Sequence, residues 1–209
     1  MKETIKKYIE NNNQEFQRYN SWNHCYKAFS NLNQESDFLA LHLAFYLASW
    51  GMYRGSSNLL DKDYKVHVEA VSIIKHFAHL RCDKNNEVSI DNLEDILLLI
   101  KNLSVHYEKK HKVTPTDTLI SKIILGTLGC APAFDRFFIQ GVKQEKRKFT
   151  TLKRRSLNSL FHFIVENEKL MNTLKKTYPQ YSTMKLVDMY YWQIGYDRNT
   201  LKCNNKSFR

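Results

Sequence analysis

The chain has 209 residues, of which 43% are hydrophobic and 25% charged, a composition ordinary for a folded protein with a buried core. Glycine (6) and proline (3) are scarce, which disfavours a turn-rich β-sandwich and favours helices. No window approaches the roughly 20 unbroken apolar residues of a membrane span, and the N-terminal residues lack the apolar core of a signal peptide. We therefore expect an all-α, cytoplasmic protein.

Helical spacing of the apolar residues predicts a bundle of about eight helices. In chain order, the run from Ser36 to Leu60 is apolar on most sides, so we expect a central, buried helix that bends or ends near Tyr53 and Arg54. Later helices are expected over residues 63–80, 93–107, 116–128, 132–141, 151–178 and 182–194, with Pro132 at the first position of its helix. We expect one domain over 1–209, or alternatively two lobes, 1–112 and 113–198, with 199–209 as a basic tail.

The net charge of +11 is unevenly distributed along the chain. Residues 1–110 hold 14 Lys and Arg against 14 Asp and Glu, whereas residues 111–209 hold 18 against 7. A one-sided basic surface attracts polyanions, of which nucleic acid is the commonest. An anionic membrane surface is the alternative, but no lipid-anchor motif supports it. We therefore expect a nucleic-acid partner, in particular double-stranded DNA, and no membrane.

The stretch SKIILGTLGCAPAFDRFF places Lys122 on an apolar helix and then, after a Gly-broken turn, sets Asp135 among aromatic residues. A carboxylate held in this way can activate water and stabilise an oxocarbenium-like sugar, as carboxylates do in glycoside hydrolysis. An acidic residue that only favours the helix dipole is the alternative. Asp135 and Lys122 are thus the candidate catalytic residues.

This stretch resembles the segment of helical base-excision DNA glycosylases in which a lysine-bearing helix leads into a P-x-x-D turn. The stretch STMKLVDMYYWQIGYD is similar to a basic–x–x–D–x–x–x–W helix of glycosylase-like bacterial proteins, with Lys185, Asp188 and Trp192 carrying the match. The resemblance covers about a third of the chain, which lacks the LPGVG-type hairpin that helix-hairpin-helix glycosylases use to grip DNA. It implies a helical glycosylase-like fold, Asp135 as the catalytic carboxylate, and DNA contact through other residues.

Base flipping and DNA contact can be assigned to further candidates. An enzyme that attacks a base must extrude it and hold it by stacking and edge contacts. The predicted pocket residues are Trp50, Tyr53, Arg54 and Phe134, although aromatic core filling is the alternative. Seven of the thirteen positions from Lys143 to Arg155 are basic, with Glu145 the one opposing charge, which suits phosphate binding or a solvated helix junction. The predicted DNA-binding residues are Arg136, Lys143, Lys146, Arg147, Lys148, Lys153, Arg154 and Arg155.

The resulting hypothesis is a monofunctional DNA glycosylase that releases a modified or damaged base, in repair or in defence against phages, without a metal or other cofactor. Two alternatives stay open. Arg155 and His162 lie seven residues apart and resemble the R-x4–6-H signature of HEPN ribonucleases, which cleave RNA without a metal, usually as dimers. A catalytically silent nucleic-acid-binding module would show the same basic surface.

Overall fold

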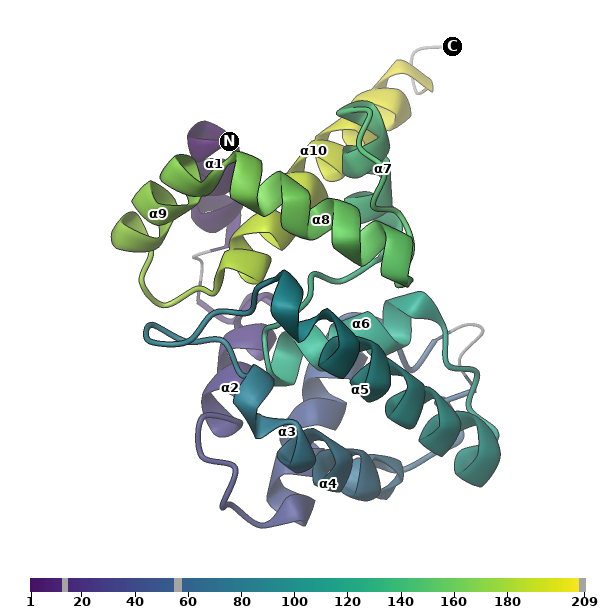
Figure 1. The fold of residues 1–209 in the computed structure, drawn as a ribbon. Coiled ribbons are helices and arrows are strands. Elements are labelled where there is room, and N and C mark those ends of the chain that lie inside the picture. The colour runs from purple at the N-terminus through teal and green to yellow at the C-terminus, as the bar shows by residue number, and fades with distance from the viewer. Residues whose placement is uncertain (13–14, 55–57, 207–209) are drawn as a thin grey trace.

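The computed structural model describes residues 1–12, 15–54 and 58–206, and it confirms the all-α prediction (Figure 1). Within these residues there are ten α-helices, where the sequence predicted about eight, and no strand. The helices are α1 (Lys2–Asn12), α2 (Asn20–Ala28), α3 (Ser36–Ser49), α4 (Val68–His76), α5 (Leu93–Val105), α6 (Asp117–Thr127), α7 (Arg136–Gln144), α8 (Arg154–Glu166), α9 (Glu168–Thr177) and α10 (Thr183–Lys206).

The helices form two halves of one bundle. In Figure 1, α2 to α6 make up the lower half, whereas α1 and α7 to α10 make up the upper half. Helix α6 packs against α2, α3 and α5, and α1 from the start of the chain packs against α10 from its end. One hydrophobic core runs through both halves. The proposed lobes, 1–112 and 113–198, stay a prediction.

Helices α7 and α10 cross in close contact because each presents a glycine to the other. A Cβ atom added at Gly141 would overlap the backbone carbonyl of Tyr191, and one added at Gly195 would overlap the carbonyl of Phe137. Side chains at these two positions would force the helices apart. The close crossing places Phe137 on α7 beside Trp192 on α10, with their ring centroids 5.2 Å apart.

The structure corrects the expectation that the helix within the run from Ser36 to Leu60 is buried. Helix α3 ends at Ser49, and its face with Phe38, Leu41 and Phe45 is 44%, 53% and 59% exposed. The opposite face, with Leu39 and Leu43, lies in the core. A helix that is apolar all round can therefore still have one face in contact with solvent, because isolated surface apolar residues cost little.

Further helix boundaries differ from those predicted, and one is the end of the last helix, expected at residue 194, because α10 continues to Lys206. The helix expected from 151 to 178 is divided at Asn167, whose non-helical backbone separates α8 from α9. Pro132 does not begin a helix, since α7 begins at Arg136 and the preceding turn is longer than the sequence suggested. No helix in the described ranges has both the length and the apolar character needed to cross a membrane.

Candidate active site

The site is built on the turn between α6 and α7. Gly129, at φ +68°, ends α6 and donates its backbone N–H to the Ile124 carbonyl at 2.8 Å. This left-handed conformation is the usual way for a helix to end on glycine. The carbonyl of Gly129 in turn accepts a hydrogen bond from the Ser182 hydroxyl at 3.0 Å, just before α10 begins. The turn is therefore held against α10 from its first residue.

Buried polar side chains fix the rest of the turn. The Ala133 N–H donates to Oδ1 of Asp188 on α10 at 3.0 Å. The Phe134 N–H donates to the Ser121 hydroxyl at 2.8 Å, and the Phe134 carbonyl accepts from the Thr118 hydroxyl at 2.9 Å. Three side chains from two helices thus hold the backbone that presents the next residue, Asp135.

Asp135 is the N-cap of α7 and also the partner of a buried lysine. Its Oδ1 accepts hydrogen bonds from the N–H groups of Phe137 and Phe138, each at 3.0 Å. Its Oδ2 accepts from Nζ of Lys122, also at 3.0 Å, and the two side chains are 12% and 4% exposed. A carboxylate can accept about four hydrogen bonds. One acceptor position of Asp135 therefore stays open for a ligand or a water molecule.

A cavity of about 300 Å³ lies beside the Asp135 carboxyl. It is lined by Arg18, Trp50, Met52, Thr118, Lys122, Asp135, Arg136, Phe137 and Trp192. Small-molecule pockets usually measure roughly 300–1,000 Å³, so this cavity has room for a group about as large as a single base. The lining combines three aromatic rings with three cations and one carboxylate.

The cations of the cavity lie over its aromatic rings. Nζ of Lys122 is 4.5 Å from the centre of the Trp50 ring, and the guanidinium of Arg18 is 5.3 Å from the same ring. The guanidinium of Arg136 lies 4.6 Å from the centre of the Phe137 ring. Such contacts stabilise the cations and hold the rings in place. The cavity wall is therefore ordered by contacts among its own residues.

A second buried lysine–aspartate pair lies on α10. Nζ of Lys185 donates to Oδ2 of Asp188 at 2.9 Å, and the side chains are 4% and 6% exposed. Lys185, Asp188 and Trp192 follow one face of α10 at spacings of three and four residues. The K-x-x-D-x-x-x-W stretch therefore has a clear structural role: Asp188 holds the turn, and Trp192 forms part of the cavity wall.

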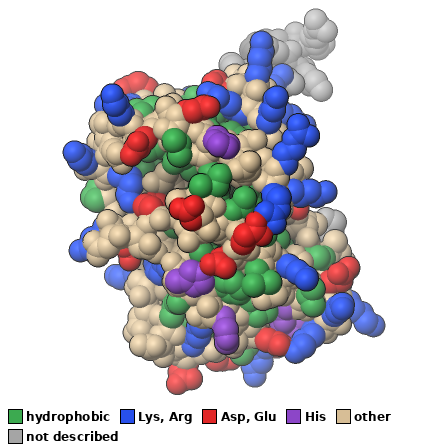
Figure 2. Space-filling model, in the orientation of Figure 1, with side chains coloured by type: hydrophobic (Ala, Val, Ile, Leu, Met, Phe, Trp, Pro, Cys, Tyr) green, Lys and Arg blue, Asp and Glu red, His purple; other side chains and the backbone are tan. Residues whose placement is uncertain are grey.

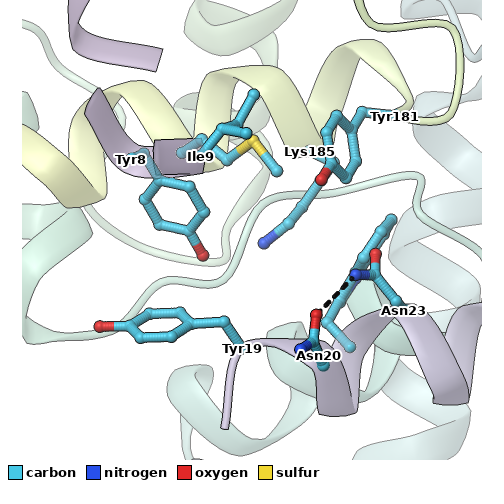
Figure 3. Close-up of a pocket in the computed structure, with 9 residues that line it drawn as sticks. Tyr8, Ile9, Tyr19, Asn20, Asn23, Tyr181 and Lys185 are labelled. Carbon is cyan, nitrogen blue, oxygen red and sulfur yellow. Dashed lines mark hydrogen bonds between the residues drawn. The ribbon is translucent and has the colours of Figure 1, made fainter. Parts of the chain in front are cut away.

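Figure 3 shows the surroundings of Lys185, whose ammonium group points into a space between Tyr8, Tyr19 and the hydrogen-bonded pair Asn20 and Asn23. This space measures about 30 Å³, which is enough for about one water molecule. Burial raises the pKa of the Tyr8 phenol well above its usual value, and the charge of Asp188 adds to this shift. The Lys185 pair thus has no room for a ligand, in contrast to the Lys122 pair.

Four of the sequence-predicted residues come together at the larger cavity: Asp135, Lys122, Trp50 and Arg136. Three others lie elsewhere. Phe134 is fully buried in the core. The Tyr53 hydroxyl lies 2.8 Å from Nε2 of His67, and burial raises the pKa of this phenol to about 12. Arg54 is exposed.

The cavity also contains residues that were not among the predicted pocket or catalytic residues. Phe137 directly follows the P-A-F-D-R stretch, and Trp192 belongs to the second quoted stretch, so both had a sequence signal. Arg18 had none, because it reaches the cavity from a segment distant in sequence, whereas Met52 and Thr118 lie two and four residues from the predicted Trp50 and Lys122 but have no charge or ring that would single them out. Arg18 precedes α2, Met52 follows α3 and Thr118 begins α6.

The basic stretch lies along one edge of the molecule. Figure 2 shows Lys and Arg side chains along the right-hand edge, at the height of α7 and the start of α8, and others along the left-hand edge. Lys143 and Lys146 line a hollow of about 620 Å³ that also includes Arg198. Arg136 and Lys143 are seven residues apart on α7, so they share a face of this helix about 10 Å apart.

Two members of the basic stretch have carboxylate partners. Arg154 makes a two-pronged ion pair with Glu94, and Arg147 lies 3.7 Å from Glu166. For the remaining five (Lys143, Lys146, Lys148, Lys153 and Arg155) no carboxylate of the described chain lies within ion-pair distance.

The Arg155 and His162 pair of the ribonuclease alternative is not brought into contact. Both side chains are exposed on α8, two helical turns apart. His162 lines a hollow of about 270 Å³ with Lys146, Arg147 and Lys148, but Arg155 does not. Among the side chains that the structure describes, no group of three His, Cys, Asp or Glu residues could hold a metal ion.

Comparison of the chain with protein-family models, with curated proteins and with solved structures finds no match. The functional interpretation therefore depends on the geometry of the cavity and the chemistry of its residues.

Proposed function

We propose that this chain is a DNA glycosylase that hydrolyses the N-glycosidic bond of a modified or damaged base, with Asp135 as its catalytic carboxylate. The observation that carries the proposal is the position of this carboxyl. It is buried, paired with Lys122, and lies in the wall of a cavity lined by aromatic rings. A cell could use such an enzyme in repair or against phages with modified DNA.

The second lysine–aspartate pair serves as an internal reference. Asp188 has the same kind of partner and even deeper burial, but the space beside it fits only about one water molecule. A purely structural ion pair has no need of a cavity the size of a base. The difference between the two pairs therefore favours a chemical role for Asp135 and a positioning role for Asp188.

In the proposed reaction the target nucleotide leaves the duplex and its base enters the cavity, where Trp50, Phe137 and Trp192 provide an apolar wall. As the bond from C1′ to the base breaks, the base leaves with the electron pair and positive charge develops on the sugar. The Asp135 carboxylate stabilises this charge, and water adds at C1′ and gives up a proton, while the departing base anion takes up one. The products are the free base and an abasic site.

Lys122 positions the catalytic carboxylate in this scheme. Its Nζ donates to Oδ2 of Asp135 at 3.0 Å and lies 4.5 Å from the centre of the Trp50 ring, so neighbours within the chain already engage it. We therefore expect base release without strand cleavage. Contacts to the DNA backbone would come from Arg136 and from the basic stretch between Lys143 and Arg155, whose free cations suit phosphate binding.

The proposal is tested by incubating the protein with duplexes that each carry one modified base and then heating them in alkali, which cuts abasic sites. Wild-type protein should produce alkali-labile sites, and Asp135→Asn should not. Because Asp135→Asn also leaves Lys122 without its partner, the double variant Lys122→Met/Asp135→Asn provides a folded control without the carboxylate. The exposed carboxylate Asp95 offers a matched control, and Asp95→Asn should keep full activity.

Two results would contradict the proposal. One is base release by folded Asp135→Asn at the wild-type rate. The other is the absence of alkali-labile sites from the wild-type protein across a broad set of modified bases at enzyme excess.

A further inference from the structure

The charges and ring contacts of the Asp135 cavity restrict which bases can enter it. From these contacts we infer that the cavity selects a neutral or anionic base rich in hydrogen-bond acceptors and rejects cationic, alkylated bases. This inference rests on the proposed function and deepens it by naming the class of substrate.

The lining of the cavity carries an excess of positive charge. Three cations, Arg18, Lys122 and Arg136, face the cavity against the single carboxylate of Asp135. Lys122 and Asp135 neutralise each other through their 3.0 Å hydrogen bond, which leaves the two guanidinium groups as excess charge. Neither guanidinium has a carboxylate within ion-pair distance in the described part of the chain. A cationic base would meet uncompensated like charge.

Other side chains of the protein already lie against the aromatic rings of the cavity. Recognition of a positively charged group by an aromatic cage needs ring faces that are free of other cations. Here the Trp50 ring already has Lys122 at 4.5 Å and Arg18 at 5.3 Å, and Arg136 lies over Phe137 at 4.6 Å. Trp192 stacks on Tyr196 with ring centroids 5.0 Å apart. The chain's own side chains thus take up the surfaces that a cationic base would need.

The arginine side chains of the cavity offer hydrogen-bond donors and no acceptors. Guanidinium groups can only donate hydrogen bonds, so Arg18 and Arg136 can hydrogen-bond only to acceptor groups of a ligand. The Thr118 hydroxyl already donates to the Phe134 carbonyl at 2.9 Å. A base with carbonyl or carboxylate substituents supplies the acceptors that these residues need. A base alkylated on a ring nitrogen has lost one of its acceptors.

The test compares lesions that are similar in size and differ in charge. Duplexes would carry 8-oxoguanine or N7-methylguanine as the purine pair, and 5-carboxycytosine or 3-methylcytosine as the pyrimidine pair. Base release and equilibrium binding are both measured, so that recognition is read separately from chemistry. We expect the neutral or anionic member of each pair to be preferred by more than about tenfold, because juxtaposed like charges are strongly unfavourable.

Arg18→Gln then tests the cause of this preference, since Arg18 is exposed and lies outside the ion pair. It should reduce the preference by about three- to fivefold, because it removes one of the two excess positive charges that a cationic base meets, and a charge contact near the surface has a small effect of about this size. Lys27→Gln removes an exposed cation from α2, away from the cavity, and should leave the preference unchanged.

The possible outcomes distinguish the selectivity of the cavity from the glycosylase activity. Release of cationic bases in preference to their partners would overturn this inference and leave the glycosylase proposal standing. Selective binding of the acceptor-rich lesions without release of any base would support the inference and overturn the hydrolysis. Equal binding of all lesions, or an unchanged preference in Arg18→Gln, would overturn the inference whether or not bases are released.

Discussion

The buried pair of Lys122 and Asp135 leads to a quantitative prediction about stability. In Asp135→Asn, the new Oδ1 can still accept from the N–H groups of Phe137 and Phe138, so the helix cap is retained. The ammonium group of Lys122, 4% exposed, loses its anionic partner. Removal of one member of a buried pair typically costs about 3–5 kcal/mol. We expect a loss of this size in the free energy of unfolding.

The double variant Lys122→Met/Asp135→Asn should recover most of this loss. Methionine has nearly the volume of the lysine stem and leaves no buried charge. Its thioether can also pack on the Trp50 ring. The two single substitutions should therefore be strongly non-additive, with an interaction energy of at least about 2 kcal/mol.

Urea unfolding of the four proteins of this cycle, followed by circular dichroism, provides the measurement. Glu94→Gln serves as a control, because it breaks an exposed pair and should leave the unfolding midpoint unchanged. If the losses in the two single variants sum to the loss in the double variant to within about 0.5 kcal/mol, Lys122 and Asp135 do not act as a pair.

Three further predictions follow from other parts of the molecule. Gly195→Ala should lower the melting temperature and reduce base release together. The reason is that a Cβ at this position overlaps the Phe137 carbonyl and would displace a wall of the cavity. An unchanged melting temperature would refute the close crossing of α7 and α10. Burial lowers the pKa of His67 from 6.5 to about 3. Between these pH values the unfolded chain binds a proton that the folded protein does not. The free energy of unfolding should therefore fall as the pH drops from 6.5 towards 3. This loss amounts to at most roughly 5 kcal/mol, and His67→Gln should flatten the profile measured by urea unfolding at each pH. Lys146→Glu/Lys148→Glu should weaken DNA binding and reduce the slope of its salt dependence by about two in a titration series, while an unchanged slope would place the DNA elsewhere.

The parts of the fold that the sequence predicted are those set by local rules. Helical spacing and the lack of glycine and proline identified the all-α class, and the Thr116 cap and the Gly129 turn marked the two ends of α6. The start of α7 was misjudged because proline commonly begins a helix, whereas Asp135 caps this one three residues later. The exposed face of α3 could not be predicted, since its sequence is apolar on both sides and only tertiary packing decides which side faces the core.

The candidate site was predictable in its chemistry but not in its full composition. Lys122 and Asp135 are thirteen residues apart, close enough for one helix and one turn to bring them together. Arg18 and Trp192, in contrast, are separated by most of the chain and meet because α1 packs along α10 and so brings the start of α2 to the same place. Tyr53 was assigned to the pocket because the predicted helix was expected to bend or end close to it. The early end of α3 instead turns Tyr53 towards His67.

The arrangement of the two ion pairs explains why a protein would keep both despite their cost in desolvation. Buried pairs of this kind rarely stabilise a fold relative to well-packed apolar residues. Here Asp188 binds the backbone of the turn at Ala133, and Asp135 caps the helix that the same turn leads into. The first pair therefore determines where the second carboxyl lies, and one acceptor of that carboxyl is left open towards a cavity. Replacement of Lys185 and Asp188 by apolar residues removes two buried charges but leaves the Ala133 N–H without its acceptor, so the protein should fold with reduced stability. Its Asp135 is then no longer held in place, and base release should fall more than binding.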